Sequence, residues 1–300
     1  MPGPLVTIGI PLVNEDIEEI QLAVRSVYAQ SLPDWELVFF CDGSSPERVR
    51  MLERIDDPRV SIIVNETSQG IASSLNRLAD MAAGKYIAIL AADDMWTPDR
   101  LQKQIARMEE AGAPDVLAAQ MVVISDSVTV EGAQKPARVP NSSRGWVEGT
   151  PISHATAVAT SGWFRDHPYD TSLIRAQDRA FWIRSHKGSR IEIMDDAVYF
   201  YRVPKPLSYR KYAWGSKYAR QVIWRYGREI CSTPAVAVIY AKSLVKQAVV
   251  AAATLLGRSD RLYYRRIDPL TGPELETLRG DLEEIRRTTV PGWPSRDGAS

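Results

Sequence analysis

Cysteine and histidine are scarce in this chain. Its 300 residues include two cysteines, at positions 41 and 231, and three histidines, at positions 154, 167 and 186. Two distant cysteines do not make a disulfide framework, and histidines without ligand spacing do not indicate a zinc site. We therefore expect a protein of the reducing cytoplasm.

Glycine-rich nucleotide motifs and membrane signals are missing as well. The sequence has neither the G-x-G-x-x-G fingerprint nor the G-x-x-x-x-G-K-[ST] phosphate loop, which argues against hydride transfer and ATP hydrolysis. The amino terminus leads directly into a predicted strand rather than a basic and then apolar leader, so secretion is not supported. The best candidate for a membrane span, residues 244–256, is interrupted by Lys246 and Gln247, and we expect no spanning helix.

The net charge is zero, but the charged residues are unevenly distributed along the chain. Residues 202–266 contain fourteen basic and two acidic residues, and aromatic side chains alternate with the cations between positions 209 and 228. This pattern favours a helix on an anionic bilayer, and it predicts peripheral contact with the inner face of the cell membrane through residues 208–266. The alternative is a solvated helix that packs its aromatics on the rest of the protein. No nucleic-acid recognition motif accompanies the charge, so nucleic-acid binding is not expected.

Strand and helix patterns alternate over the first 111 residues. Apolar runs at 6–11, 36–41, 60–64 and 86–91 predict strands, and amphipathic segments between them predict helices, which indicates a largely parallel sheet covered on both faces. Further on, the pattern predicts strands at 116–125, 191–194 and 197–203, a helix at 178–186, and a polar mobile loop at 127–150. Beyond residue 208 we expect helices and then a disordered tail at 291–300. Mixed charges over 274–287 predict a surface helix or one that faces a second copy in a homodimer.

Acidic residues stand at the ends of several predicted elements. Asp93 and Asp94 end the apolar run at 86–92, Asp42 ends an earlier strand, and Asp178 opens a helix. Because α/β folds bind ligands at the carboxyl ends of their strands, we expect these carboxylates to share one cleft. Alternatives remain for each: Asp94 and Asp178 as acids at helix entrances, and Asp42 as an Asx-turn residue.

The order and spacing of motifs over residues 5–205 resemble the inverting family 2 glycosyltransferases, and among them the capsule and exopolysaccharide enzymes. The matching segments are IPLVNE at 10–15, WELV at 35–38, DGS at 42–44, Gly70, SLNR at 74–77, GKYI at 84–87, ADD at 92–94, PDRL at 98–101, His154, AQD at 176–178, FWIR at 181–184 and YR at 201–202. The resemblance implies an α/β GT-A fold at 1–206. Its nucleotide-sugar-binding half at 1–115 merges with an acceptor half at 116–206 in a mixed, mainly parallel sheet, and a helical region follows at 207–300.

The same resemblance implies roles for single residues. The donor is a nucleoside diphosphate sugar, with UDP as the default nucleotide, and the acceptor is a carbohydrate or a lipid-linked glycan. Asp178 is the expected catalytic base, and Asp93 is the expected ligand of Mg²⁺ or Mn²⁺. The other residues expected at the donor are Pro11, Asn14, Glu15, Asp42, Gly70, Asn76, Ala92 and Asp94. On the acceptor side we expect His154 and Trp182, with a buried structural histidine and a core tryptophan as the alternatives.

Three positions depart from the family pattern. Ala91 occupies the place of the first acid of the DxD motif, Val13 that of an aromatic that stacks on the base, and Gln177 that of a glutamate before the catalytic base. An inactive relative that serves as a binding or assembly subunit is therefore the alternative function, with a nucleotidyltransferase third. Arg100 is expected either to pair with an acid at a strand end or to be a solvated residue of the first helical turn.

Overall fold

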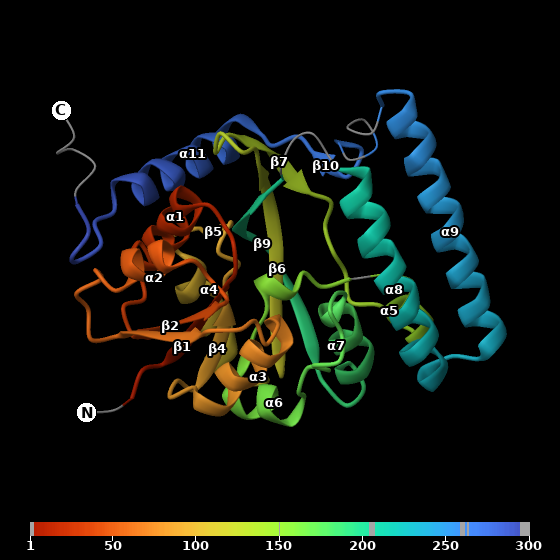
Figure 1. Ribbon diagram of the computed structural model, residues 1–300, viewed down its shortest axis with the longest axis horizontal. Helices are drawn as coiled ribbons and strands as arrows, with labels where there is room; N and C mark the ends of the chain where they lie inside the picture. Colours follow the sequence, from red (N-terminus) through yellow and green to blue (C-terminus); the bar gives the residue numbers. More distant parts are fainter. Residues whose placement is uncertain (1–2, 150, 204–207, 259–261, 263, 295–300) are drawn as a thin grey trace.

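The computed structural model describes residues 3–149, 151–203, 208–258, 262 and 264–294. Within these residues one mixed sheet forms the centre of the molecule (Figure 1). Its strands are β1 (Val6–Leu12), β2 (Trp35–Asp42), β3 (Val60–Asn65), β4 (Tyr86–Ile89), β5 (Met95–Trp96), β6 (Val116–Ile124), β7 (Val130–Gln134), β8 (Val158–Thr160), β9 (Ile191–Arg202) and β10 (Ile267–Asp268). They are hydrogen-bonded in the order β10-β7-β6-β8-β4-β1-β2-β3, and β9 joins β5 to β6.

The amino-terminal half of the sheet is parallel throughout. β3, β2, β1 and β4 pair in parallel, so their carboxyl ends share one edge, as the alternation of strand and helix patterns predicted. In the second half β9 pairs in parallel with β6, whereas β7, β8 and β10 pair antiparallel with their neighbours. The α/β class and the mixed sheet are therefore confirmed.

Helices cover both faces of the sheet and extend beyond it. They are α1 (Ile17–Tyr28), α2 (Pro46–Leu52), α3 (Ile71–Met81), α4 (Arg100–Glu109), α5 (Ser143–Glu148), α6 (Ser161–Asp166), α7 (Gln177–Ser185), α8 (Tyr209–Ile230), α9 (Thr233–Leu255) and α11 (Gly272–Arg287), with a 3-10 turn η1 (His154–Thr156). α1 begins at Asp16, whose side chain accepts a hydrogen bond from the Glu18 amide and forms a capping box with Glu19.

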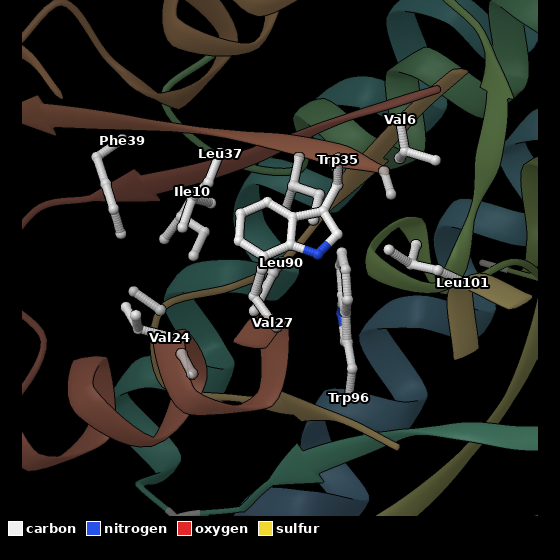
Figure 2. Close-up of a cluster of buried hydrophobic side chains, with 14 of the residues drawn as sticks. Val6, Ile10, Val24, Val27, Trp35, Leu37, Phe39, Leu90, Trp96 and Leu101 are labelled. Atoms are coloured by element: carbon white, nitrogen blue, oxygen red, sulfur yellow. The ribbon is translucent and has the colours of Figure 1, made fainter. Parts of the chain in front are cut away.

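Side-chain alternation along β1 explains the two packed layers. Val6, Ile8 and Ile10 are buried on the face covered by α1 and α4. Figure 2 shows this layer, in which Trp35 and Trp96 lie among aliphatic side chains from the strands and from α1. On the opposite face Gly9 allows α3 to approach, because a Cβ there would lie 2.2 Å from Leu78 Cδ2.

Three loop and strand predictions are corrected by the structure. The polar segment 127–150 contains β7 and α5, because strand pairing with β6 and burial of Trp146 order it. Residues 191–202 form the single strand β9 instead of two strands. In the predicted disordered tail, Trp293 donates from Nε1 to the Met51 carbonyl at 2.9 Å, and the positions after 294 lie outside the described residues.

The region after residue 207 is not a separate helical unit. α8 and α9 form an antiparallel pair beside α5 and α7, but β10 then adds a strand to the sheet by pairing with β7 (Figure 1). α11 continues back to the other half of the molecule and buries Leu278, Leu282 and Ile285 against residues such as Leu22 and Phe200. The apolar face of α11 is thus covered by its own chain, while most of its charged residues are exposed, so α11 is a surface helix and a homodimer contact stays a prediction.

The expectation that no helix is long enough to span a membrane is wrong for α9. It has 23 residues, its most apolar window has a mean hydropathy of 1.5, and 11% of that window is buried. Lys246 and Gln247 do not interrupt it, because both residue types favour helix. Length and composition alone do not distinguish a spanning helix from one that lies on a surface.

Candidate active site

A cleft of about 500 Å³ opens where the two halves of the sheet meet. Asp94 enters it after β4, His154 from η1, Asp178 from α7 and Tyr201 from β9. These four residues are separated by up to 107 positions in the sequence, and the fold brings their side chains to one opening. Of the carboxylates expected to share one cleft, Asp94 and Asp178 do so, whereas Asp42 and Asp93 are not among its described lining residues.

Asp178 is placed by an unusual helix start. Ala176 has φ 60° and ψ 27°, a left-handed conformation that turns the chain into α7 and puts Asp178 in the first turn. Burial raises the pKa of Asp178, and hydrogen bonding to the Arg179 amide together with the charge of Arg179 oppose that rise. A carboxylate with a raised pKa is a stronger proton acceptor than a free aspartate.

Asp94 and its neighbour Asp93 have different surroundings. Asp94 is 3% exposed and accepts hydrogen bonds from the Tyr199 hydroxyl at 2.8 Å and the Arg202 amide at 2.7 Å. Burial, followed by the charge of Asp93, raises the pKa of Asp94 well above its usual value. Asp93 is only partly buried, so it is the more accessible of the two carboxylates.

The donor set around Asp93 fits a cation that arrives with a nucleotide. Among the described residues no group of three or more His, Cys, Asp or Glu side chains forms a metal cluster. Burial and the charge of Glu15 raise the pKa of Asp93, while Arg202 lowers it, so a further positive charge here is favourable. Mg²⁺ and Mn²⁺ bound by diphosphates need one or two protein carboxylates, and Asp93 supplies one.

Asp42 organises the loop that follows β3. Its carboxylate accepts from the Ser68 hydroxyl at 2.7 Å, from the Gln69 and Gly70 amides at 2.7 Å each, and from Asn65 Nδ2 at 3.0 Å. Burial raises its pKa, but these hydrogen bonds together lower it below the usual value. Four donors fill the acceptor sites of a carboxylate, so Asp42 holds the loop in shape, and direct contact with a base or ribose stays a prediction.

The remaining donor-side candidates act mainly through the backbone. Arg48 donates from Nε to the Glu15 carbonyl at 2.7 Å and from Nη2 to the Asn14 carbonyl at 3.1 Å, which fixes the turn after β1. Pro11 lies within β1, opposite Phe40 of β2. The side chain of Ala92 is 2% exposed and belongs to the core, so Ala92 can offer a ligand only its backbone.

Asn76 does not have a free side chain for a nucleotide. Its Nδ2 donates to the Tyr169 carbonyl at 3.1 Å, and its Oδ1 accepts from the Tyr169 amide at 2.7 Å. The Tyr169 hydroxyl in turn bonds to Nε2 of His154. Asn76 therefore positions Tyr169, and through it His154, which corrects its assignment to the donor.

His154 lies between the cleft and an aromatic cluster. Its ring contacts the Tyr169 and Phe181 rings edge-on, with distances between ring centroids of 5.3 and 5.4 Å. Its Nδ1 is buried with no partner among the described residues. Burial lowers the pKa of His154 to about 4, so the ring is neutral at pH 7. The cleft-side position keeps the predicted contact with substrate open, and the packing shows that the histidine is structural as well.

Two other expectations are wrong. Trp182 is 1% exposed and packs in the core against Phe181 and Trp163, so it does not contact an acceptor. Arg100 is not exposed and, among the described residues, is not paired with an acid: it is 0% exposed, its Nε donates to Gln104 at 2.9 Å, and its guanidinium lies 4.0 Å from the Trp96 ring centre. A helical period cannot reveal such burial, because it depends on which elements cover the first turn.

Sequence reasoning missed six polar residues of the cleft, namely Gln120, Gln134, Lys135, Ser153, Tyr201 and Arg266. Tyr201 is the most informative, because burial and then the charges of Asp94, Asp93 and Asp178 raise its pKa to about 12. The Tyr201 side chain thus interacts electrostatically with all three carboxylates. The YR motif at 201–202 contained this signal, whereas Lys135 and Arg266 had no local signal beyond their charge.

Comparison with known proteins assigns this site to a family. The glycosyl transferase family 2 profile matches residues 7–170, which is more than half of the chain and includes β1 to β4 with Asp93 and Asp94. The chain belongs to this family. The glycosyltransferase is 26% identical over 242 residues to an uncharacterized glycosyltransferase of Methanocaldococcus jannaschii, covering 77% of this chain and 83% of the relative.

Two bacterial relatives carry more specific names. A putative colanic acid biosynthesis glycosyl transferase of Escherichia coli is 29% identical over 187 residues, covering 61% of this chain and 66% of the relative. The UDP-Glc:alpha-D-GlcNAc-diphosphoundecaprenol beta-1,3-glucosyltransferase of Escherichia coli is 35% identical over 109 residues, covering 36% of this chain and 42% of the relative. The predicted likeness to capsule and exopolysaccharide enzymes is thereby confirmed.

Solved structures establish the fold. A mannosyltransferase from Pyrobaculum calidifontis, solved with GDP-Man and Mn²⁺, superposes with a TM-score of 0.57 at 17% identity, covering 94% of this chain and 85% of that one. At this identity the likeness concerns the fold alone. The glycosyltransferase described here has the predicted GT-A fold with carboxyl-terminal helices.

Proposed function

We propose that this glycosyltransferase moves a sugar from a nucleoside diphosphate sugar to a hydroxyl of a glycan acceptor with inversion at the anomeric carbon. The observation that carries the proposal is the position of Asp178. Its carboxylate has a raised pKa and lines the same cleft as Asp94, the neighbour of the predicted metal ligand Asp93. A single base facing the donor site is what a one-step inverting displacement requires.

The chemistry divides between the two sides of the cleft. Asp178 accepts the proton of the acceptor hydroxyl as its oxygen forms a bond to the anomeric carbon, and the bond from that carbon to the diphosphate oxygen breaks on the opposite face. Negative charge then develops on the leaving diphosphate. Asp93 would hold Mg²⁺ or Mn²⁺, and the cation supplies Lewis-acid stabilisation of that charge when bound.

The donor is assigned to the carboxyl edge of β1, β2 and β4. Arg48 fixes the turn after β1, and Asp42 fixes the loop before α3, so the edge is preorganised for a nucleotide. We propose UDP as the nucleotide, which is supported by the UDP-glucose in the name of one Escherichia coli relative. Mg²⁺ or Mn²⁺ is supported by the Mn²⁺ in the Pyrobaculum structure.

The acceptor is proposed to be a lipid-linked glycan in polysaccharide assembly on the cytoplasmic side of the membrane. The names of the two Escherichia coli relatives support it, since one refers to colanic acid and the other to a diphosphoundecaprenol acceptor. We propose that α9 provides the membrane contact. Its exposed aliphatic residues are Val238, Leu244, Val245, Val249 and Leu255.

α9 suits an interfacial position better than α8. Tyr226 of α8 is buried and Trp224 packs edge-on against Tyr240 of α9. α8 exposes the large apolar side chains of Trp214 and Trp224, fewer than α9 exposes. A helix with one apolar face and nearby cations lies in the plane of the bilayer interface. This moves the proposed contact from the aromatic residues of α8 to the outer face of α9.

One observation favours the second candidate function, an inactive assembly subunit. Ala91 lines the cleft where the family pattern has the first acid of DxD, so one oxygen donor is missing. Nucleotide binding without turnover, or no nucleotide binding at all, would support that alternative.

Two substitutions with a matched control test the proposed function. Asp178→Asn should keep nucleotide binding and lower turnover about 100- to 10,000-fold, the range for loss of a general base. Asp93→Asn should instead weaken the metal-dependent binding of UDP measured by calorimetry with and without Mn²⁺. Asp34→Asn, at an exposed position, is the control and should match the wild type in both measurements. Wild-type activity in Asp178→Asn would refute the proposed role of the base.

A further inference from the structure

Four cations lie in or near the cleft, and two of them line it. Lys135 and Arg266 line the cleft together with Asp178. Arg179 follows Asp178 on α7, and Lys246 of α9 lies in the electrostatic field of both Arg179 and Arg266. Because these residues come from four distant segments, only the tertiary fold gathers them.

The charges of the four cations are largely uncompensated, although the charge of Asp178 acts on Arg179. Within residues 3–149, 151–203, 208–258, 262 and 264–294, none of the four has a carboxylate within ion-pair distance. Burial and then repulsion by Arg266 and Arg179 lower the pKa of Lys246. Nη2 of Arg179 donates to the carbonyls of residues 147–149, and its Nε is buried without a partner. Unpaired cations around one opening attract a multivalent anion.

The sheet order places this anion site apart from the donor diphosphate. Arg266 directly precedes β10, which is separated from β4 by β7, β6 and β8. Asp93 follows β4, and Asp178 lies in the cleft that Asp94 and Arg266 both line. The attacking acceptor hydroxyl must reach this cleft, because Asp178 is its proposed base.

We propose that Lys135, Arg179, Lys246 and Arg266 bind the diphosphate of a lipid-linked acceptor and thereby hold its sugar at Asp178. This inference rests on the proposed function and adds the residues that recognise the acceptor. The position of α9 fits it: Val245 and Val249 are exposed on the helix, whereas Lys246 interacts with cations of the cleft. A diphosphate at the level of the lipid headgroups would then reach Lys246 while the apolar face of α9 contacts the bilayer.

Calorimetry with farnesyl diphosphate in metal-free buffer tests the site without requiring the natural acceptor. Lys246→Ala and Arg266→Ala should each raise the Kd of farnesyl diphosphate about tenfold, which corresponds to about 1.4 kcal/mol. Lys242→Ala and Arg265→Ala remove the same charge from the same segments and should leave the Kd unchanged. Lys242 pairs with Glu148, and among the described residues Arg265 neither lines the cleft nor is one of the two cations that act on Lys246. Farnesol, which lacks the diphosphate, should bind all five proteins equally weakly.

UDP with Mn²⁺ is titrated into the same proteins as a donor probe. Unchanged UDP binding in Lys246→Ala and Arg266→Ala supports an acceptor site, whereas an equal loss of UDP and farnesyl diphosphate binding assigns the cations to the donor and overturns the inference. Equal weakening in the control variants, or no farnesyl diphosphate binding by wild-type protein that binds UDP, overturns it too. Failure of the wild type to bind any nucleotide instead defeats the proposed function.

Discussion

Buried His154 gives the protein a stability that depends on pH in a predictable direction. In the folded chain burial lowers its pKa to about 4, whereas the ordinary value of a histidine is 6.5. Between these pH values the unfolded chain binds a proton at this position and the folded chain does not. Acidification therefore favours unfolding, and above pH 6.5 the contribution of His154 is constant.

The size of the effect follows from the two pKa values. At pH 4.5 the proton bound by the unfolded state corresponds to a loss of about 2.5 kcal/mol in the free energy of unfolding relative to pH 7, at about 1.36 kcal/mol per pH unit. This is a large part of the stability of an ordinary domain, which is about 5–15 kcal/mol. Carboxylates also titrate in this range, so the contribution of His154 must be taken as a difference between variants.

Urea denaturation of wild type and His154→Gln at pH 7 and pH 4.5 isolates the contribution. Wild type should lose about 2.5 kcal/mol more than His154→Gln on acidification. Tyr169→Phe is the matched control, because it removes the hydroxyl bonded to Nε2 but leaves the ring buried. It should keep the wild-type pH dependence. Equal losses in wild type and His154→Gln would refute the argument that burial suppresses protonation.

Two further predictions concern packing and a buried cation. Gly84→Ala should lower the free energy of unfolding by about 2 kcal/mol, because its Cβ would lie 2.5 Å from the Thr7 backbone nitrogen and that strand cannot move aside. Gly280→Ala, in an open position on α11, should instead raise it by about 0.5–1 kcal/mol, and a similar loss in both variants in urea denaturation would contradict the steric explanation. Arg100→Met should leave the thermal midpoint unchanged or raise it, since burial lowers the pKa of Arg100 to about 9 and both terminal nitrogens are buried without partners. A loss of more than about 2 kcal/mol in calorimetry would show that the Gln104 and Trp96 contacts outweigh the burial of the charge.

Local sequence patterns were sufficient to predict the elements that depend on neighbouring residues. The strands and helices of residues 6–109 follow the predicted order, because periodicity, caps and turns are properties of adjacent residues. The family motifs also identified the carboxylates Asp94 and Asp178 before their meeting in the cleft was visible. The predictions failed where partners are distant, because β7 and α5 depend on β6 and the C-terminal helices.

The sequence by itself determined the α/β class, the family and the acids at the ends of the strands, because each depends on residue types at fixed spacing. Only the tertiary structure decided which charged side chains are buried and which face the cleft. Arg100 is enclosed in the core, while Arg266 lines the cleft with Asp178, although both are simply basic residues in the sequence. The physical reason is that desolvation and electrostatic interaction depend on distances between segments, and chain connectivity alone does not fix those distances.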